Sequence, residues 1–235
     1  MAGSVVTNYL KIDSTRVSFG EYWRWKQSPA FLILAVCKLL KVRLGTTLLA
    51  PAVATVDEVA PGGQPPELVA ALQPAIRSCL EKGYAISFWY TVPTLGSIQG
   101  LAVALTSADD LSAALAMAGQ SRDGLQREVH LSLVSRLLGG KLLGTSQHRS
   151  LFDPAPKIEP LVLRGQPYAA LLDAHAARVN SRGAEVDPVG DMRELVRELE
   201  QLQIDTNLAR GVYVPASPED VAKVMRSQMP QTPTW

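Results

Sequence analysis

The chain has 235 residues, 47% of them hydrophobic and 19% charged, with a formal net charge of +1 at pH 7. This composition is too apolar for a disordered protein and too often interrupted by charge for one that crosses a membrane several times. A nearly neutral chain with 6% aromatic residues lacks both the basic field and the stacking rings of nucleic-acid-binding proteins, so we expect no nucleic-acid partner. The length allows one large hydrophobic core.

The cysteines and the N-terminus indicate a cytoplasmic protein. Cys37 and Cys79 lie in apolar surroundings and form no CxxC pair, so we expect both thiols to be buried and reduced. Two separated cysteines and three histidines do not predict a metal site, and no motif predicts a cofactor. The chain also lacks the early basic stretch and directly following apolar run of a signal peptide.

Residues 1–59 predict an N-terminal arm ahead of a core domain at residues 60–235, because a connector rich in proline and glycine spans residues 50–66. Within the arm, residues 30–44 predict a helix whose apolar run is too short to cross a bilayer. Two interpretations of this helix stay open: it packs against the core, or it lies in the plane of a membrane surface. The side chains expected to contact a membrane or a partner are those of Trp23, Trp25, Lys38, Lys41 and Arg43.

The first part of the core predicts one helix followed by three strands. The helix covers about residues 66–82, and Pro74 inside it predicts a kink or a break. Apolar residues then alternate with polar or small ones over residues 84–92, 98–106 and 111–119, a pattern typical of strands. The alternation predicts large apolar side chains on one face of the sheet, which should hold the main core, and small ones on the other.

Residues 128–138 and 141–149 predict two further strands, joined at Gly139-Gly140 by a two-residue turn in which both glycines can take positive φ. Residues 160–163 predict one more short strand. We therefore predict an α+β fold, with an antiparallel sheet of about five strands and helices mainly on one of its faces.

The register of this hairpin decides how its histidines lie. A two-residue turn places His148 opposite Leu131, and therefore on the other face of the sheet from His130. The two rings could not then share a metal ion or a proton, whereas a slip of one residue would bring them to the same side. The third histidine, His175, falls on the apolar stripe of a predicted helix and is expected in the core.

Three helices are expected after the sheet, each with a recognisable first turn. Pro167 is suited to the first position of one helix, and Asp191 to the N-terminus of the next. The last helix has the strongest boundary, with Ser217 as N-cap, Pro218 at the first position and Asp220 at the third.

No catalytic or phosphate-binding motif occurs in the sequence. The leading hypothesis is therefore a non-enzymatic interaction or scaffold protein, with a protein partner or a second copy of itself, that associates with a membrane through its arm. The alternative is a small-ligand or enzymatic pocket between the sheet and the helices. Its expected polar groups are His130, Ser132 and Arg136, which share one strand face and together could hold an anion.

Three segments, in this order, resemble uncharacterised bacterial proteins: PPELVAALQPAIRSCLEKGYAISFWY from Pro65, GGKLLGTSQHRSLFDPAP from Gly139 and YAALLDAHAARV from Tyr168. In those proteins a kinked helix, an antiparallel sheet and a closing helical segment follow an apolar N-terminal segment. The resemblance covers about residues 60–215; it implies proximity to a membrane and no activity. Here the apolar segment departs from the pattern, because it is short and interrupted by lysines.

Overall fold

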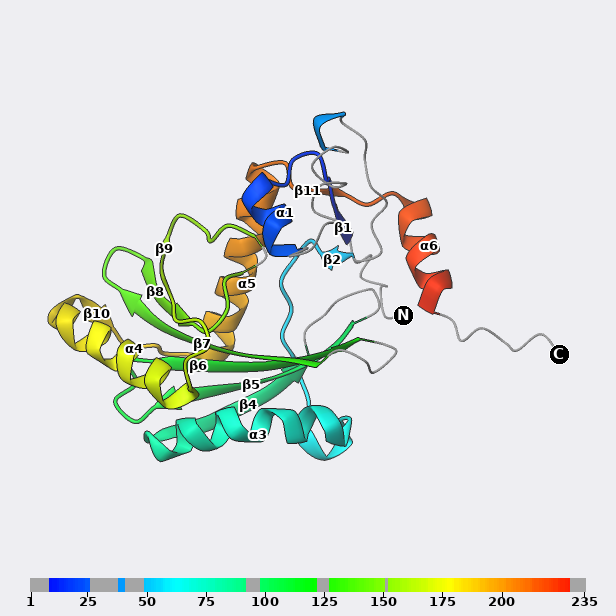
Figure 1. Ribbon diagram of the computed structural model, residues 1–235. Helices are drawn as coiled ribbons and strands as arrows, with labels where there is room; N and C mark the ends of the chain where they lie inside the picture. The colour runs from blue at the N-terminus through cyan, green and yellow to red at the C-terminus, as the bar shows by residue number, and fades with distance from the viewer. Residues whose placement is uncertain are drawn as a thin grey trace, which may run out of the picture.

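The computed structural model describes residues 9–25, 38–40, 49–91, 98–121, 127–150 and 152–228. It contains a large mixed β-sheet with helices on both faces, and a small second sheet (Figure 1). The large sheet is made of β3 (Asp57–Glu58), β4 (Tyr84–Thr91), β5 (Ile98–Ser107), β6 (Ala113–Ser121), β7 (Arg127–Leu137), β8 (Lys141–Ser146), β9 (Ile158–Val162) and β10 (Val186–Asp187). The small sheet is made of β1 (Tyr9–Ile12), β2 (Ala50–Pro51) and β11 (Tyr213–Pro215). The α-helices are α1 (Phe19–Trp25), α3 (Pro66–Glu81), α4 (Tyr168–Arg182), α5 (Met192–Ala209) and α6 (Pro218–Gln228), and short 3-10 helices cover Pro61–Gly63 and Gly183–Glu185.

The large sheet has the strand order β3-β4-β5-β6-β7-β8-β9, and β10 pairs with the end of β7. Neighbouring strands are antiparallel except β8 and β9, which are parallel. The α+β class is confirmed, but the prediction of about five antiparallel strands is wrong. β3 and β10 are two residues long, too short to show a period in the sequence, and the direction of β9 depends on the connection before it.

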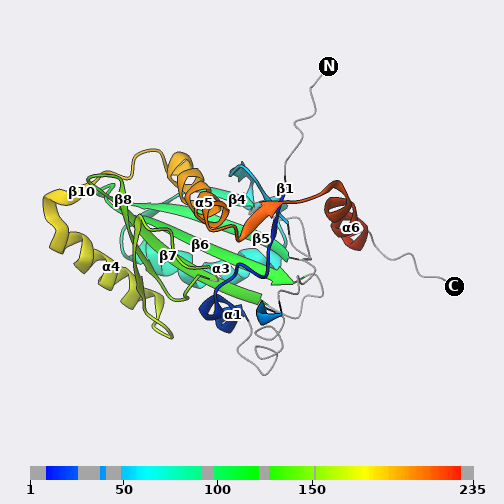
Figure 2. The same cartoon turned by 90° about the horizontal axis from the view of Figure 1, so that it is seen from above.

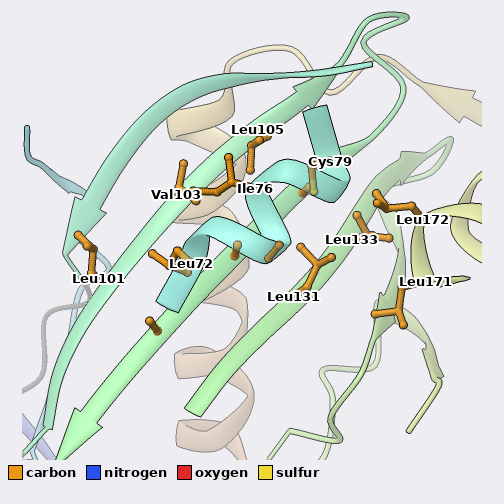
Figure 3. Close-up of a cluster of buried hydrophobic side chains, with 14 of the residues drawn as sticks. Leu72, Ile76, Cys79, Leu101, Val103, Leu105, Leu131, Leu133, Leu171 and Leu172 are labelled. Carbon is orange, nitrogen blue, oxygen red and sulfur yellow. The ribbon is translucent and has the colours of Figure 1, made fainter. Parts of the chain in front are cut away.

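Helices cover both faces of the large sheet, so the expectation of helices mainly on one face is also wrong. α3 and α4 lie on one face and α5 on the other (Figures 1 and 2). The buried cluster beneath α3 contains Leu101, Val103 and Leu105 of β5 (Figure 3). The β6 residues paired with these three are all alanines, so large and small side chains alternate from strand to strand. Each face therefore keeps enough apolar surface to bind a helix.

A bulge in β4 changes which of its side chains share a face. The pairing with β5 shifts between Ile86 and Phe88, so one residue of β4 has no opposite number. As a result Tyr84 packs beneath α3, whereas Phe88 and Tyr90 pack beneath α5. The strict alternation of the sequence predicts all of them on one face, and the extra residue reverses that order halfway along the strand.

The helix boundaries follow the capping residues. Asp191 is the N-cap of α5 and accepts hydrogen bonds from two backbone N–H groups of the first turn. Ser217 caps α6, as predicted, and it exchanges with Asp220 the reciprocal hydrogen bonds of a capping box. Pro167 lies one position before α4 rather than at its first residue. α3 continues through Pro74 without a break.

The described part of the predicted arm joins the C-terminal part of the chain. β1 pairs with β11 as well as with β2. The buried carboxylate of Glu21 in α1 accepts hydrogen bonds from Arg210, at 2.7 Å, and from the backbone N–H of Asp153, at 2.8 Å. Burial alone would raise the pKa of Glu21, but these bonds and those from Ser18 outweigh it and lower the pKa to about 2. The division between arm and core stays a prediction.

Most of the predicted helix at residues 30–44 lies outside the described residues, which include only residues 38–40 of it. No helix in the described part of the chain is long and apolar enough to cross a bilayer. Cys79 is buried and free, as predicted, and burial raises the pKa of its thiol to about 12. Cys37 lies outside the described residues.

Candidate ligand-binding pocket

A cavity of about 780 Å³ lies between α5 and the part of the large sheet formed by β6, β7, β8 and β9. Leu115, Ser132 and Gly144 contribute to it from β6, β7 and β8, Ile158 from β9, and Leu199 from α5. Ligand pockets for small organic molecules generally have volumes of roughly 300–1,000 Å³ and mainly apolar walls with a few polar groups. The cavity therefore has the size and the lining of a small-molecule site.

The cavity exists because α5 leaves part of the sheet uncovered. Leu195 and Val196, in the first half of the helix, are buried in the cluster on this face. Leu199, one turn further on, is only half-buried, and so are Leu115 and Met117 of β6. Since β6 has a neighbouring strand on each side, these apolar side chains owe their exposure to the space above the sheet rather than to a sheet edge. A bound molecule would remove this apolar surface from water.

Glu200 of α5 supplies a carboxyl group to the wall of the cavity. The side chain is half-buried, and none of the hydrogen bonds or ion pairs found among the described residues involves it. Burial raises the pKa of Glu200 to about 7, because a carboxylate that leaves water without a partner loses solvation. The negative charge of Glu200 in turn contributes, after burial, to the raised pKa of Tyr90. At neutral pH the carboxyl group can therefore donate a hydrogen bond as well as accept one.

Two arginines, Arg149 and Arg164, also line the cavity. Both are exposed, and neither makes a hydrogen bond or an ion pair within the described part of the chain. Together with Glu200, they are the charged groups among the described residues that line the cavity. They could hold a negatively charged group of a bound molecule at the mouth.

The three predicted polar residues of β7 lie on the face that carries α5, but they have different surroundings. Ser132 lines the cavity. Arg136 does not, because its guanidinium donates to Glu198 at 2.5 Å and to the backbone carbonyl of Val189 at 3.1 Å. His130 lies two residues before Ser132 and is half-buried. Of the expected set, Ser132 is thus the member that the structure places in the cavity lining.

The two hairpin histidines lie together, contrary to the predicted register. Leu137 pairs with Lys141, so the turn has three residues rather than two, and the pairing is shifted by one position. The aromatic rings of His130 and His148 are in edge-to-face contact, with centroids 4.6 Å apart. No group of three or more histidine, cysteine, aspartate or glutamate side chains suited to a metal ion occurs in the parts of the chain that are described.

His175 is buried in the core, as predicted, and it lies on the other face of the sheet. Its Nε2 lies 3.0 Å from the hydroxyl of Ser135 and its Nδ1 lies 3.0 Å from that of Thr145. Burial, with the nearby charge of Arg178, lowers the pKa of His175 to about 4, so the ring is neutral at pH 7. A serine beside a histidine resembles a nucleophile with its base, but all three side chains are inaccessible. The network satisfies buried polar groups in the core.

The arm residues expected at a membrane or a partner are described only in part. Trp23 is 55% exposed. Lys38 is turned toward the protein, where its ammonium donates to the backbone carbonyls of Thr15, at 2.9 Å, and Val17, at 2.6 Å. The side chain of Trp25, together with Lys41 and Arg43, lies outside the described residues.

Glu200, Arg149 and Arg164 are absent from the residues that the sequence predicts for a site. Glu200 could have been found, because it follows Val196 by four residues and so takes a position on the apolar stripe of its helix. The two arginines carry no such signal, since exposed arginines are common in loops. Comparisons of the chain with models of protein families, with curated proteins and with solved structures found no match.

Proposed function

We propose that this protein binds a small, mainly apolar molecule in the cavity between the large sheet and α5. The observation that supports the proposal combines half-buried apolar side chains in the sheet with the carboxyl group of Glu200, which lines the same cavity and has no bonding partner among the described residues. An unpaired carboxyl group in apolar surroundings destabilises a folded protein. A ligand that accepts a hydrogen bond from it, and covers Leu115 and Met117, would offset that cost.

Binding of Nile red, an uncharged dye whose fluorescence rises in apolar surroundings, tests the proposal. We expect saturable binding, and at least about a tenfold weaker affinity when Ser132→Phe or Gln203→Phe fills the cavity from the sheet or from α5. Both residues line the cavity. Ser87→Phe is the matched control, because Ser87 is an exposed strand residue in β4 and is not part of the lining.

Urea unfolding of each variant establishes that it is folded before its affinity is compared. Two filling variants that fold and still bind the dye as tightly as the wild type would contradict the proposal. A uniform loss of affinity in all three variants, the control included, would show that the dye senses another apolar surface.

As a second function we propose docking through the arm, to a protein partner, a second copy of the chain or an anionic membrane at the cytoplasmic side. Four large apolar side chains support it: Phe19 is 44% exposed, Trp23 55%, Leu39 71% and Leu40 70%. The segments that carry them are adjacent, since the Lys38 ammonium lies 5.4 Å from the centre of the Phe19 ring. Exposed apolar groups gathered in one place are typical of interaction surfaces.

Vesicle co-sedimentation and light scattering distinguish these occupants. Membrane docking predicts that the protein sediments with anionic vesicles but not with neutral ones, and that Leu40→Ser weakens this. Self-association predicts that the apparent molecular mass rises with protein concentration. At a given concentration the mass should be lower for Leu40→Ser than for the wild type. Leu138→Ser is the control, because Leu138 is 58% exposed in the hairpin turn on the large sheet. Equal behaviour of the two variants would rule out docking through the arm.

A further inference from the structure

The charges of the cavity are unevenly placed, and this asymmetry restricts the ligand. The cations Arg149 and Arg164 belong to the segments that follow β8 and β9, whereas the carboxyl group of Glu200 belongs to α5. Within the described residues that line the cavity there are thus two permanent positive charges and one group that is partly neutral at pH 7. The net charge facing a ligand is positive.

The parallel pairing of β8 and β9 brings together the two segments that carry the arginines. Ser146, the last residue of β8, pairs with Val162, the last residue of β9. Because parallel strands end at the same edge of a sheet, the residues that follow them emerge side by side. Arg149 comes three residues after Ser146, and Arg164 two residues after Val162. Two guanidinium groups at one edge can bind the same anionic group.

The apolar part of the lining restricts the other end of the ligand. Leu115, Met117, Val134 and Ile158 lie on strands of the sheet, and Leu199 lies on α5. None of these side chains can hydrogen-bond strongly, so this part of the cavity favours an aliphatic or aromatic body. Solvent-exposed cations next to a half-buried apolar surface match a molecule that has both a negative charge and an apolar body.

Resting on the proposed function, we propose that the ligand is an amphipathic anion: an apolar body in the cavity with one carboxylate, sulfate or phosphate group held by Arg149 and Arg164. Neither arginine makes an ion pair with another described residue, so the anion has no carboxylate of the protein to displace there. The carboxyl group of Glu200, on α5, is free to bond a polar substituent on the body.

Three probes with the same ten-carbon chain and different head groups test this inference: decanoate, decanol and decyltrimethylammonium. Each competes with Nile red for the 235-residue chain, at concentrations below those at which the probe aggregates. We expect decanoate to bind about tenfold or more tightly than either of the others, since a hydrogen bond to a charged group is worth more than a neutral one. In the double variant Arg149→Gln/Arg164→Gln, decanoate should fall to the affinity of decanol, while decanol binds as in the wild type.

The control is Arg77→Gln/Arg197→Gln, which removes the same net charge from two exposed arginines that are not part of the lining. It should leave the preference for decanoate unchanged. If the three probes bind alike and Ser132→Phe abolishes all of them, the anion inference fails and the pocket stands. Tightest binding of decyltrimethylammonium would also overturn the inference, in favour of a cation selected by Glu200. If no probe displaces the dye, or Ser132→Phe has no effect, the proposed function fails with it.

Discussion

Replacing Glu200 by glutamine should increase the free energy of unfolding. The increase should appear as the pH rises above about 4.5. The pKa of Glu200 rises from 4.5 to about 7 on folding, because of burial. A shift of one pKa unit corresponds to about 1.4 kcal/mol, so the upper limit of the cost is about 3.4 kcal/mol. The side chain is half-buried, and water screens part of the cost, so we expect about 1.5–2 kcal/mol.

The sign of the effect follows from the protonation states. Well below pH 4.5 the carboxyl group is neutral in both the folded and the unfolded chain, and Glu200→Gln changes little. As the pH rises toward 7, the unfolded chain ionises first, so the wild type loses stability relative to the variant. Above about pH 7.5 the full difference should be present. Between about pH 4.5 and 7, the Glu200 carboxyl group is thus protonated more in the folded chain than in the unfolded chain.

Urea unfolding at pH values between 4 and 8, followed by circular dichroism, measures the difference directly. Other titrating groups, including His175, are present in both proteins and cancel to first order. Glu194→Gln is the control on the same helix; Glu194 is exposed, so its effect should stay within about 0.5 kcal/mol. A difference for Glu200→Gln that does not vary with pH, or a variant less stable than the wild type at pH 8, would refute the reasoning.

Two further predictions use the other polar groups of the fold. Glu21→Gln should destabilise the protein by about 3 kcal/mol at pH 7, because it breaks a buried ion pair with Arg210. Since the pKa of Glu21 is about 2 in the folded state, its contribution is complete above pH 4.5 and is lost as the pH falls toward 2; urea unfolding that shows a constant difference over this range would contradict it. Ser135→Ala should lower the melting temperature, since it leaves the buried His175 Nε2 without its 3.0 Å partner, at a cost of about 1–3 kcal/mol. Ser132→Ala on the same strand should cost less than about 0.5 kcal/mol, and equal losses in the two serine variants would disprove a structural role of the network.

Local chemistry made the helix starts and most strands predictable. A serine or aspartate that accepts backbone hydrogen bonds specifies the first turn of a helix, so Asp191 and Ser217 mark α5 and α6 from sequence alone. The alternation of large and small side chains similarly located β5 and β6. These signals span only a few neighbouring residues, and no distant part of the fold alters them.

The relations between elements could not be predicted in the same way. Gly139-Gly140 favours a tight turn, but the sequence does not say whether two or three residues form it, and that one residue decides whether His130 faces His148. The bulge near Phe88 likewise reverses the faces of β4 without a local signal such as glycine. Both faces of the sheet carry helices because large residues on one strand pair with alanines on the next, a relation visible only after the strands are paired.

The contrast between His175 and Glu200 explains why the candidate site lies on one face of the sheet and not on the other. Each is a titratable side chain on a helix that packs against the sheet, and burial shifts the pKa of each toward its neutral form. Both ring nitrogens of His175 are hydrogen-bonded to hydroxyl groups of the protein. Its polar atoms are therefore satisfied within the fold. Nothing in the described part of the chain bonds Glu200. An apolar side chain at this position on the apolar face of α5 would not have the cost of desolvation. The proposed ligand would offset this cost, and the space next to Glu200 is where it would lie.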